Sequence, residues 1–329
     1  MKLASLRHPN KRDGELIVVS RDNKMAAKAG QVASCLREAV ESWSDSKAEL
    51  EKIFAELNLG RCKEAFELRT EALHSPLPRS FQWADGSAFL FHVKLVRQAR
   101  GAEMPPSLLT TPLMYQGGGD DFLAPTENIP QVDFSHGTDF EGEVAVVVDD
   151  VPMGVTAEKA LDHIILFMTV NDVSLRGLIP EELAQGFGFF QSKPSSAFGP
   201  IAVTKDELGG AYRGGRIHLP LLVTYNNERF GDPDAGAMHF HFGQLIAHAA
   251  KTRNLRAGTI IGSGTVSNED TTRGSSCLAE KRMLEKVQTG EIKTPFMKVG
   301  DSIRIEMKNE KGESIFGAID QTIVRAKFN

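Results

Sequence analysis

The stretches Asp139-Phe-Glu-Gly-Glu-Val-Ala-Val-Val-Val148 and Phe167-Met-Thr-Val-Asn-Asp-Val-Ser-Leu-Arg176 decide the fold that we expect for this chain. Glu141 and Glu143 stand two residues apart beside an apolar run, and residues two apart in a β-strand lie on the same face. Two like charges on one face repel by roughly 4 kcal/mol at 4 Å when the effective dielectric constant is near 20. We therefore expect a positive charge between these two carboxylates.

A second strand-like run, residues 164–170, ends in Asn171-Asp172. It brings a third carboxylate to a strand end, where functional sites are usually built. Three oxygen ligands without Cys or His at ligand spacing favour Mg²⁺, Ca²⁺ or Mn²⁺ over zinc. The alternative is a solvated strand face whose glutamates pair with Lys or Arg on the neighbouring strand.

Length and composition restrict the class of protein. The 329 residues are 41% hydrophobic and 25% charged, which suits one large domain or one domain with a smaller appendage. A net charge of −5 argues against nucleic acid or an anionic membrane as partner. The three cysteines are widely spaced, so no disulfide framework or zinc site is indicated. Without a signal peptide or an 18-residue apolar run, we expect a cytoplasmic protein.

The N-terminal segment reads as a small separate unit. Residues 1–20 alternate like a hairpin with Asp13-Gly14 as its turn, and apolar residues then recur at helical spacing from Ala26 to Leu57. Pro76 and Pro78 mark a boundary. We expect a small α/β domain, a β-hairpin plus helices, over residues 1–78 and a catalytic domain over residues 79–329.

Asp85 and His92 follow this boundary. Asp85 suits the N-cap of a helix over residues 87–99, which would place the two side chains near one face and about 10 Å apart along the axis. They could then touch one elongated substrate. The alternative for a single His on an apolar helix is a packed, hydrogen-bonded core residue.

The remainder of the chain indicates many short strands. Strand-like segments at residues 216–229, 257–262, 302–307 and 315–319 are separated by Gly-rich turns, with few long helices. This pattern predicts a mixed, strand-dominated α+β fold.

Seven motifs in this order resemble the fumarylacetoacetate hydrolase family, and the resemblance covers residues 80–329. They are D-x6-H (Asp85, His92), P-x-x-Y (Pro112 to Tyr115), E-x-E (Glu141, Glu143), N-D-V-S-x-R (Asn171 to Arg176), a Lys before G-P (Lys193, Gly199-Pro200), S-G-T-V-S (Ser263 to Ser267) and G-S-x-x-x-x-E (Gly274 to Glu280).

The resemblance implies a β-roll fold, usually dimeric, with a small variable N-terminal domain. It implies the following roles: Asp85, Glu141, Glu143 and Asp172 as ligands of a divalent cation (Mg²⁺, Ca²⁺ or Mn²⁺), His92 oriented by Glu280 as the base that activates water, Arg176 and Lys193 as oxyanion-stabilising residues, and Tyr115 and Thr265 as substrate contacts.

The activity that the resemblance implies is hydrolysis of a C–C bond in a small β-diketo acid, with fumarylacetoacetate, an intermediate of aromatic amino-acid (tyrosine) degradation, as the leading candidate. A His with an ordinary pKa near 6.5 is suited to take a proton from water, and a divalent cation stabilises the enolate that leaves. Two alternatives stay open. One is another activity of the superfamily, acting on an acylpyruvate or as a 2-oxo acid hydratase, isomerase or decarboxylase, and the other is a non-catalytic binding protein.

The substrate pocket departs from the family pattern. Ser87 stands where fumarylacetoacetases have a Tyr, Gln116-Gly117-Gly118 replaces their H-G-R, and Ile179 replaces a Gln. We expect an intact metal site and base beside an altered pocket.

Overall fold

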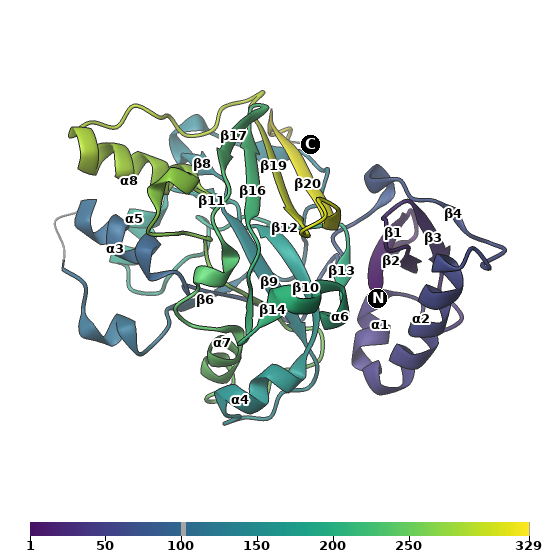
Figure 1. Ribbon diagram of the computed structural model, residues 1–329. Helices are drawn as coiled ribbons and strands as arrows, with labels where there is room; N and C mark the ends of the chain where they lie inside the picture. The colour runs from purple at the N-terminus through teal and green to yellow at the C-terminus, as the bar shows by residue number, and fades with distance from the viewer. Residues whose placement is uncertain (100–102, 329) are drawn as a thin grey trace.

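Two β-sheets carry most of the core of this computed structural model, which describes residues 1–99 and 103–328 (Figure 1). The larger sheet has 11 strands, with β12 (Ala197–Phe198) beside β10. Its path runs β4 (Phe66–Glu67), β3 (Met25–Lys28), β2 (Lys11–Val19), β1 (Lys2–His8), β13 (Ala202–Val203), β10 (Ile164–Asn171), β9 (Gly142–Val148), β18 (Ile260–Gly262), β5 (Trp83–Gly86) and β6 (Met114–Gly117).

The second sheet has five strands and packs on the first through β10. Its order is β17 (Glu228–Gly231), β16 (Leu221–Tyr225), β19 (Ser302–Lys308), β20 (Ser314–Arg325) and β7 (Ile129–Gln131). Two short pairs accompany it: β8 (Thr138–Asp139) with β11 (Ser174–Leu175), and β14 (Tyr212–Arg213) with β15 (Arg216–Ile217). Strand β10 contacts both β19 and β20, so the main core lies between the two sheets.

Strand β9 is buried on both faces, as its continuous apolar run predicts. Val144 and Val146 belong to the core cluster that includes Val223 and Ile305 of the second sheet. Ala145 lies in a second cluster with apolar residues of the N-terminal helices. The strand that carries Glu143 is therefore held rigidly in the middle of the molecule.

The helices lie around the sheets. They are α1 (Leu36–Glu41), α2 (Trp43–Asn58), α3 (Leu90–Ala99), α4 (Ala157–Ala160), α5 (Ile179–Ala184), α6 (Lys205–Leu208), α7 (Phe242–Ala249) and α8 (Leu278–Thr289), with short 3₁₀ turns between them. Helix α3 packs against α8, and α5 lies at the same end of the molecule (Figure 1). The longest described helix, α2, has 16 residues, and no described helix could span a membrane.

The predicted strand-dominated α+β fold is confirmed, but two N-terminal details are wrong. The hairpin turn falls at Pro9-Asn10, because His8 pairs with Lys11, and Asp13-Gly14 lies inside β2. The helical segment begins only at Leu36, since residues 25–28 form β3. The pairing of β1 with β13 makes the sheet continuous across residue 78, and the division into domains 1–78 and 79–329 stays a prediction.

Asp85 is not a helix N-cap. It lies on β5, between Gly262 of β18 and Tyr115 of β6, and the helix that carries His92 begins at Leu90. Pairing on both sides outweighs the local capping signal, because strand hydrogen bonds satisfy the backbone that an N-cap would serve.

Candidate active site

Three buried carboxylates from β5, β9 and the end of β10 of the large sheet meet in space. Asp85 comes from β5, Glu143 is paired with Val170 across β9 and β10, and Asp172 follows the end of β10. One oxygen of each of the three lies within 4.8 Å of the others. We call Asp85, Glu143 and Asp172 the carboxylate trio.

The hydrogen bonds of the trio leave one carboxylate without a donor. Asp172 accepts from the Tyr115 hydroxyl at 2.6 Å and from Ser196 at 2.7 Å, and Asp85 accepts from the Gly264 amide at 2.9 Å. Neither oxygen of Glu143 has a donor among the described residues. A buried carboxylate in that state is costly unless a positive charge reaches it.

Two carboxyl groups of the trio, those of Asp85 and Glu143, have raised pKa values. Burial raises the pKa of Asp85 to about 8, and the charge of Asp172 adds to this shift. Burial and the charge of Asp85 raise the pKa of Glu143 well above its ordinary value. Three converging carboxylates, one of them without a hydrogen-bond donor among the described residues, are hard oxygen ligands that fit Mg²⁺, Mn²⁺ or Ca²⁺.

Glu141 lies outside the trio, although the sequence grouped it with the metal ligands. Its Oε1 accepts from Arg176 at 2.5 Å and Thr265 at 2.9 Å. Its Oε2 accepts from Lys193 at 2.5 Å and Ser174 at 3.1 Å. Burial opposes its ionisation, but Arg176 and Lys193 outweigh burial and lower its pKa well below the ordinary value.

Lys193 links Glu141 to the trio. Its Nζ donates to Glu141 Oε2 and to Asp172 Oδ2, each at 2.5 Å. Burial disfavours the ammonium ion, yet the two carboxylates raise its pKa above the ordinary value. The positive charge that the sequence led us to expect beside the glutamates is thus partly supplied by Lys193 and Arg176.

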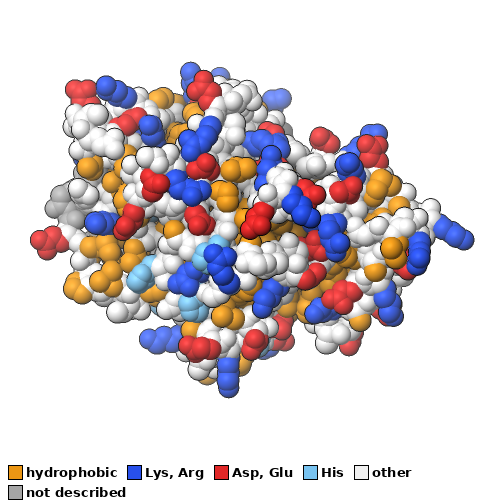
Figure 2. Space-filling model, viewed as in Figure 1, with side chains coloured by type: hydrophobic (Ala, Val, Ile, Leu, Met, Phe, Trp, Pro, Cys, Tyr) orange, Lys and Arg blue, Asp and Glu red, His pale blue; other side chains and the backbone are white. Residues whose placement is uncertain are grey.

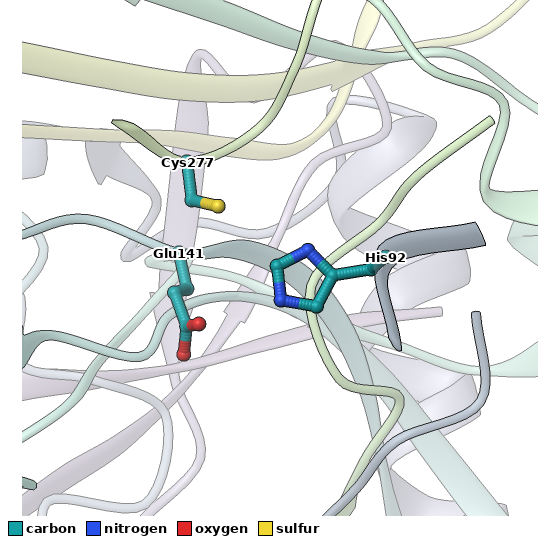
Figure 3. Close-up of side chains that lie close together, drawn as sticks. All are labelled: His92, Glu141 and Cys277. Atoms are coloured by element: carbon teal, nitrogen blue, oxygen red, sulfur yellow. The ribbon is translucent and has the colours of Figure 1, made fainter. Parts of the chain in front are cut away.

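His92 and Glu280 form a pair beside Glu141. His92 Nδ1 lies 3.0 Å from Glu280 Oε2, and the Glu280 side chain is only 1% exposed. The pair forms because α3 packs against α8. The ring of His92 points toward the Glu141 carboxylate, with the Cys277 thiol close by (Figure 3), and one ligand atom of each of these three residues lies within 4.8 Å of the others.

A cavity of about 390 Å³ joins the two groups. Of the predicted site residues, Glu143, Asp172 and Glu280 lie behind its lining. Its walls are Asp85, Gly86, Ser87, Phe89, His92, Leu113, Met114, Tyr115, Glu141, Arg176, Ile179, Leu183, Gly188, Phe189, Lys193, Gly264 and Thr265.

Comparison with known proteins identifies the family. Residues 82–324 match the model of the fumarylacetoacetate (FAA) hydrolase C-terminal region, and residues 1–79 match that of fumarylacetoacetase N-terminal domain 2. The chain belongs to the fumarylacetoacetate hydrolase family. Oxaloacetate tautomerase YisK of Bacillus subtilis is 27% identical to it over 206 residues, or 61% of this chain and 64% of that protein. The chain thus spans less than two thirds of this relative.

Two solved structures of low sequence identity share the family's fold. Fumarylacetoacetate hydrolase of Exiguobacterium antarcticum has a TM-score of 0.67 and 15% identity, covering 99% of this chain and 100% of that one. Maleylpyruvate hydrolase of Sphingobium sp. SYK-6, in complex with manganese(II) and pyruvate, has a TM-score of 0.66 and 16% identity, with the same coverage.

The sequence did not single out one residue that joins both halves of this family site. Asp139 accepts from the Leu278 and Ala279 amides at the start of α8, at 2.8 and 2.9 Å, and from Arg176 Nε at 2.9 Å. Its place two residues before Glu141 in the acidic stretch was a signal. Its partners lie 139 and 140 residues further along the chain, so no local pattern could reveal them.

Proposed function

We propose that this protein is a metal-dependent hydrolase that cleaves a C–C bond in a β-diketo acid, with fumarylacetoacetate and acylpyruvates as candidate substrates. The observation that carries the proposal is the placement of His92 and Asp85 in the wall of one cavity, the first paired with Glu280 and the second belonging to the carboxylate trio. The base that activates water and a cation held by the trio could then act on the same substrate.

His92 takes the proton of the attacking water in this proposal. Glu280, hydrogen-bonded to Nδ1, fixes the tautomer and stabilises the imidazolium that forms. The ring points toward Glu141 (Figure 3), so a water held between His92 and Glu141 would be deprotonated where the cavity admits the substrate.

Arg176 and Lys193 supply the positive charge of the pocket. Both line the cavity and are held by carboxylates, so they need no rearrangement to stabilise a developing oxyanion or a substrate carboxylate. Tyr115 and Thr265 line the same cavity, with hydroxyls already bonded to Asp172 and Glu141. We assign them to substrate contact, together with Ser87.

Asp85, Glu143 and Asp172 are the proposed metal ligands. Glu141 is proposed as a fourth, which requires Lys193 to release Glu141 Oε2. The unpaired oxygens of Glu143 support this assignment. A bound divalent cation would act as a Lewis acid for the negative charge that develops on the substrate oxygens. The complex of maleylpyruvate hydrolase with manganese(II) and pyruvate makes Mn²⁺ the first ion to test, beside Mg²⁺ and Ca²⁺.

A second candidate is tautomerisation, isomerisation or decarboxylation of a 2-oxo acid. The relative YisK, an oxaloacetate tautomerase, favours it. Such a reaction needs the cation and an enolate but no attacking water, so it depends less on the pair of His92 and Glu280. The two functions therefore predict different effects of replacing His92 on the rate of the reaction.

The test is an assay of the purified protein with Mn²⁺, Mg²⁺ or Ca²⁺ on fumarylacetoacetate, acylpyruvates and oxaloacetate. Loss of the enol absorbance together with release of one equivalent of each acid is expected, and His92→Asn should lower the rate on the order of 10²–10⁴-fold. Turnover of oxaloacetate alone, unaffected by His92→Asn, would establish the second function instead. The homodimer implied by the family is a further proposal, which sedimentation of the same sample tests.

A further inference from the structure

The residues that line the cavity are charged at its buried end and apolar at its mouth. The buried end holds Glu141 and Lys193, whose side chains are 6% and 7% exposed. At the mouth, Leu113 and Leu183 are 50% and 45% exposed and both line the cavity. Orange hydrophobic side chains gather at the end of the molecule that carries α3 and α5 (Figure 2).

The wall between these two ends is apolar. Phe89, Ile179 and Phe189 join Leu113 and Leu183 in lining it. Phe89 and Ile179 are buried, and Ile179 and Leu183 lie four residues apart on α5, so they share one face of that helix. An apolar group entering from the mouth would meet carbon on several sides.

In the part of the cavity that the structure describes, positive charge lies at the buried end. Among the described lining residues, the Lys and Arg side chains are Lys193 and Arg176, and both are already bound to buried carboxylates. Phe189 stands edge-on to Tyr115, with ring centroids 5.3 Å apart, and Lys193 lies 5.1 Å from the centre of the Tyr115 ring. Lys193 also lies 5.9 Å from the centre of the Phe189 ring, so this cation faces the inner side of the two rings, and Leu113 and Leu183 lie at the exposed mouth.

We propose that the substrate carries a single carboxylate, bound at the buried end, and an apolar acyl group that packs against Phe89, Leu113, Ile179, Leu183 and Phe189. This inference rests on the proposed function and narrows it to monoanionic acylpyruvate-type acids with an alkyl or aryl tail. The second carboxylate of a dicarboxylate would lie against this apolar wall, and burying a charge there is costly because the charge loses its hydration. Fumarylacetoacetate therefore ranks below such acids.

The reaction balances for this class of substrate. The water oxygen bonds to the tail carbonyl carbon of R–CO–CH₂–CO–COO⁻, and the bond between that carbon and CH₂ breaks. The bond's electron pair leaves with the CH₂ carbon, which then takes up a proton. The products are R–COO⁻ and pyruvate, with one proton released.

The first experiment measures binding without turnover. With Mn²⁺ present, calorimetry compares 2-oxoheptanoate, which ends in a methyl group, with 2-oxoadipate, which ends in a carboxylate. We expect 2-oxoheptanoate to bind at least tenfold more tightly, and affinity to rise roughly fourfold per added methylene in shorter homologues, as burial of CH₂ predicts. Equal or tighter binding of 2-oxoadipate, or no binding of 2-oxoheptanoate, overturns the inference.

The second experiment reverses the preference. Leu183→Arg places a cation in the outer wall and should favour 2-oxoadipate over 2-oxoheptanoate by about tenfold relative to the native protein. The matched control is Val287→Arg on α8, a helical position that is 43% exposed and outside the cavity lining, which should leave the preference unchanged. An unaltered preference in Leu183→Arg, with native circular dichroism, contradicts the assigned wall.

The two proposals can fail separately. If 2-oxoheptanoate binds more tightly than 2-oxoadipate but no C–C bond is cleaved, the hydrolase proposal is rejected and the apolar wall is supported. Cleavage of dicarboxylate substrates at higher kcat/KM than alkyl acylpyruvates would reject the wall and keep hydrolysis.

Discussion

Nδ1 of His92 lies 3.0 Å from Oε2 of Glu280, although 188 residues separate the two in the sequence. Glu280 is almost wholly buried, so the partner of the imidazole is fixed by the packing of α8. A base held in this way has one tautomer ready for proton transfer.

Glu280→Gln should therefore keep the fold and lose rate. An amide cannot stabilise the imidazolium as a carboxylate does, and we expect kcat to fall on the order of 10²-fold or more, within the range that general-base catalysis contributes. Steady-state kinetics with a cleaved β-diketo acid measure this. A rate within twofold of the native value would remove the pair from the reaction.

Glu143→Gln should stabilise the metal-free protein and abolish its response to metal. Since neither oxygen of Glu143 has a donor among the described residues, removing its charge should raise the free energy of unfolding by about 1–3 kcal/mol. The native protein should gain about 2.7 kcal/mol when Mn²⁺ reaches 100 times its Kd, and the variant should not.

Urea unfolding with and without Mn²⁺ checks both effects. Glu285→Gln is the control, because this carboxylate accepts from Thr294 and the Lys293 amide and lies outside the trio. That variant should lose stability and keep the metal response. A Glu143→Gln protein that is still stabilised by Mn²⁺ would contradict the assigned ligand.

Asp139→Asn should disturb catalysis through the residues that Asp139 holds. The asparagine side chain has one oxygen acceptor fewer for the amides at the start of α8, the helix that carries Glu280, and for Arg176. We expect kcat/KM to fall about 10–100-fold, with a displaced pH profile of kcat, because both the base and the cation are repositioned. Asp301→Asn, at another buried aspartate that bonds Tyr225 and Asn226, should cost stability without moving the pH profile.

Lys2 should make the protein more stable in alkaline solution. Burial lowers its pKa to about 8, against the opposing charge of Glu207, whereas the unfolded chain keeps the ordinary value of 10.5. Between pH 8 and 10.5 the unfolded state therefore binds more protons, and the free energy of unfolding rises with pH, by about 3 kcal/mol in total.

Lys2→Met should remove this rise and stabilise the protein at pH 7. The measurement is urea unfolding from pH 7 to 10.5, with Lys47→Met, a half-exposed lysine on α2, as control. Parallel curves for the native protein and Lys2→Met would show that Lys2 does not titrate in this way.

The family and most of the site could be predicted because seven motifs occur in the family's order, although each single motif is a weak signal. Local signals failed where pairing with distant residues decides the structure. Asp85 carried a capping signal, but its strand pairs with β18, in which Gly262 lies opposite Asp85. Gly14 has the positive φ of 67° that a turn would use, yet it serves an irregular register within β2. The bridge that Lys193 makes between Glu141 and Asp172 could not be predicted from the spacing of these residues in the sequence.

The joining of β1 to β13 also bears on how the protein could be shortened. Removing the first 79 residues would bare the hydrogen-bonding edge of β13, a short strand next to β10, and Asp172 follows β10 directly. Such an edge recruits foreign strands, so a truncated catalytic region should aggregate unless that side is capped. The N-terminal strands thus cover one edge of the sheet that carries the carboxylate trio.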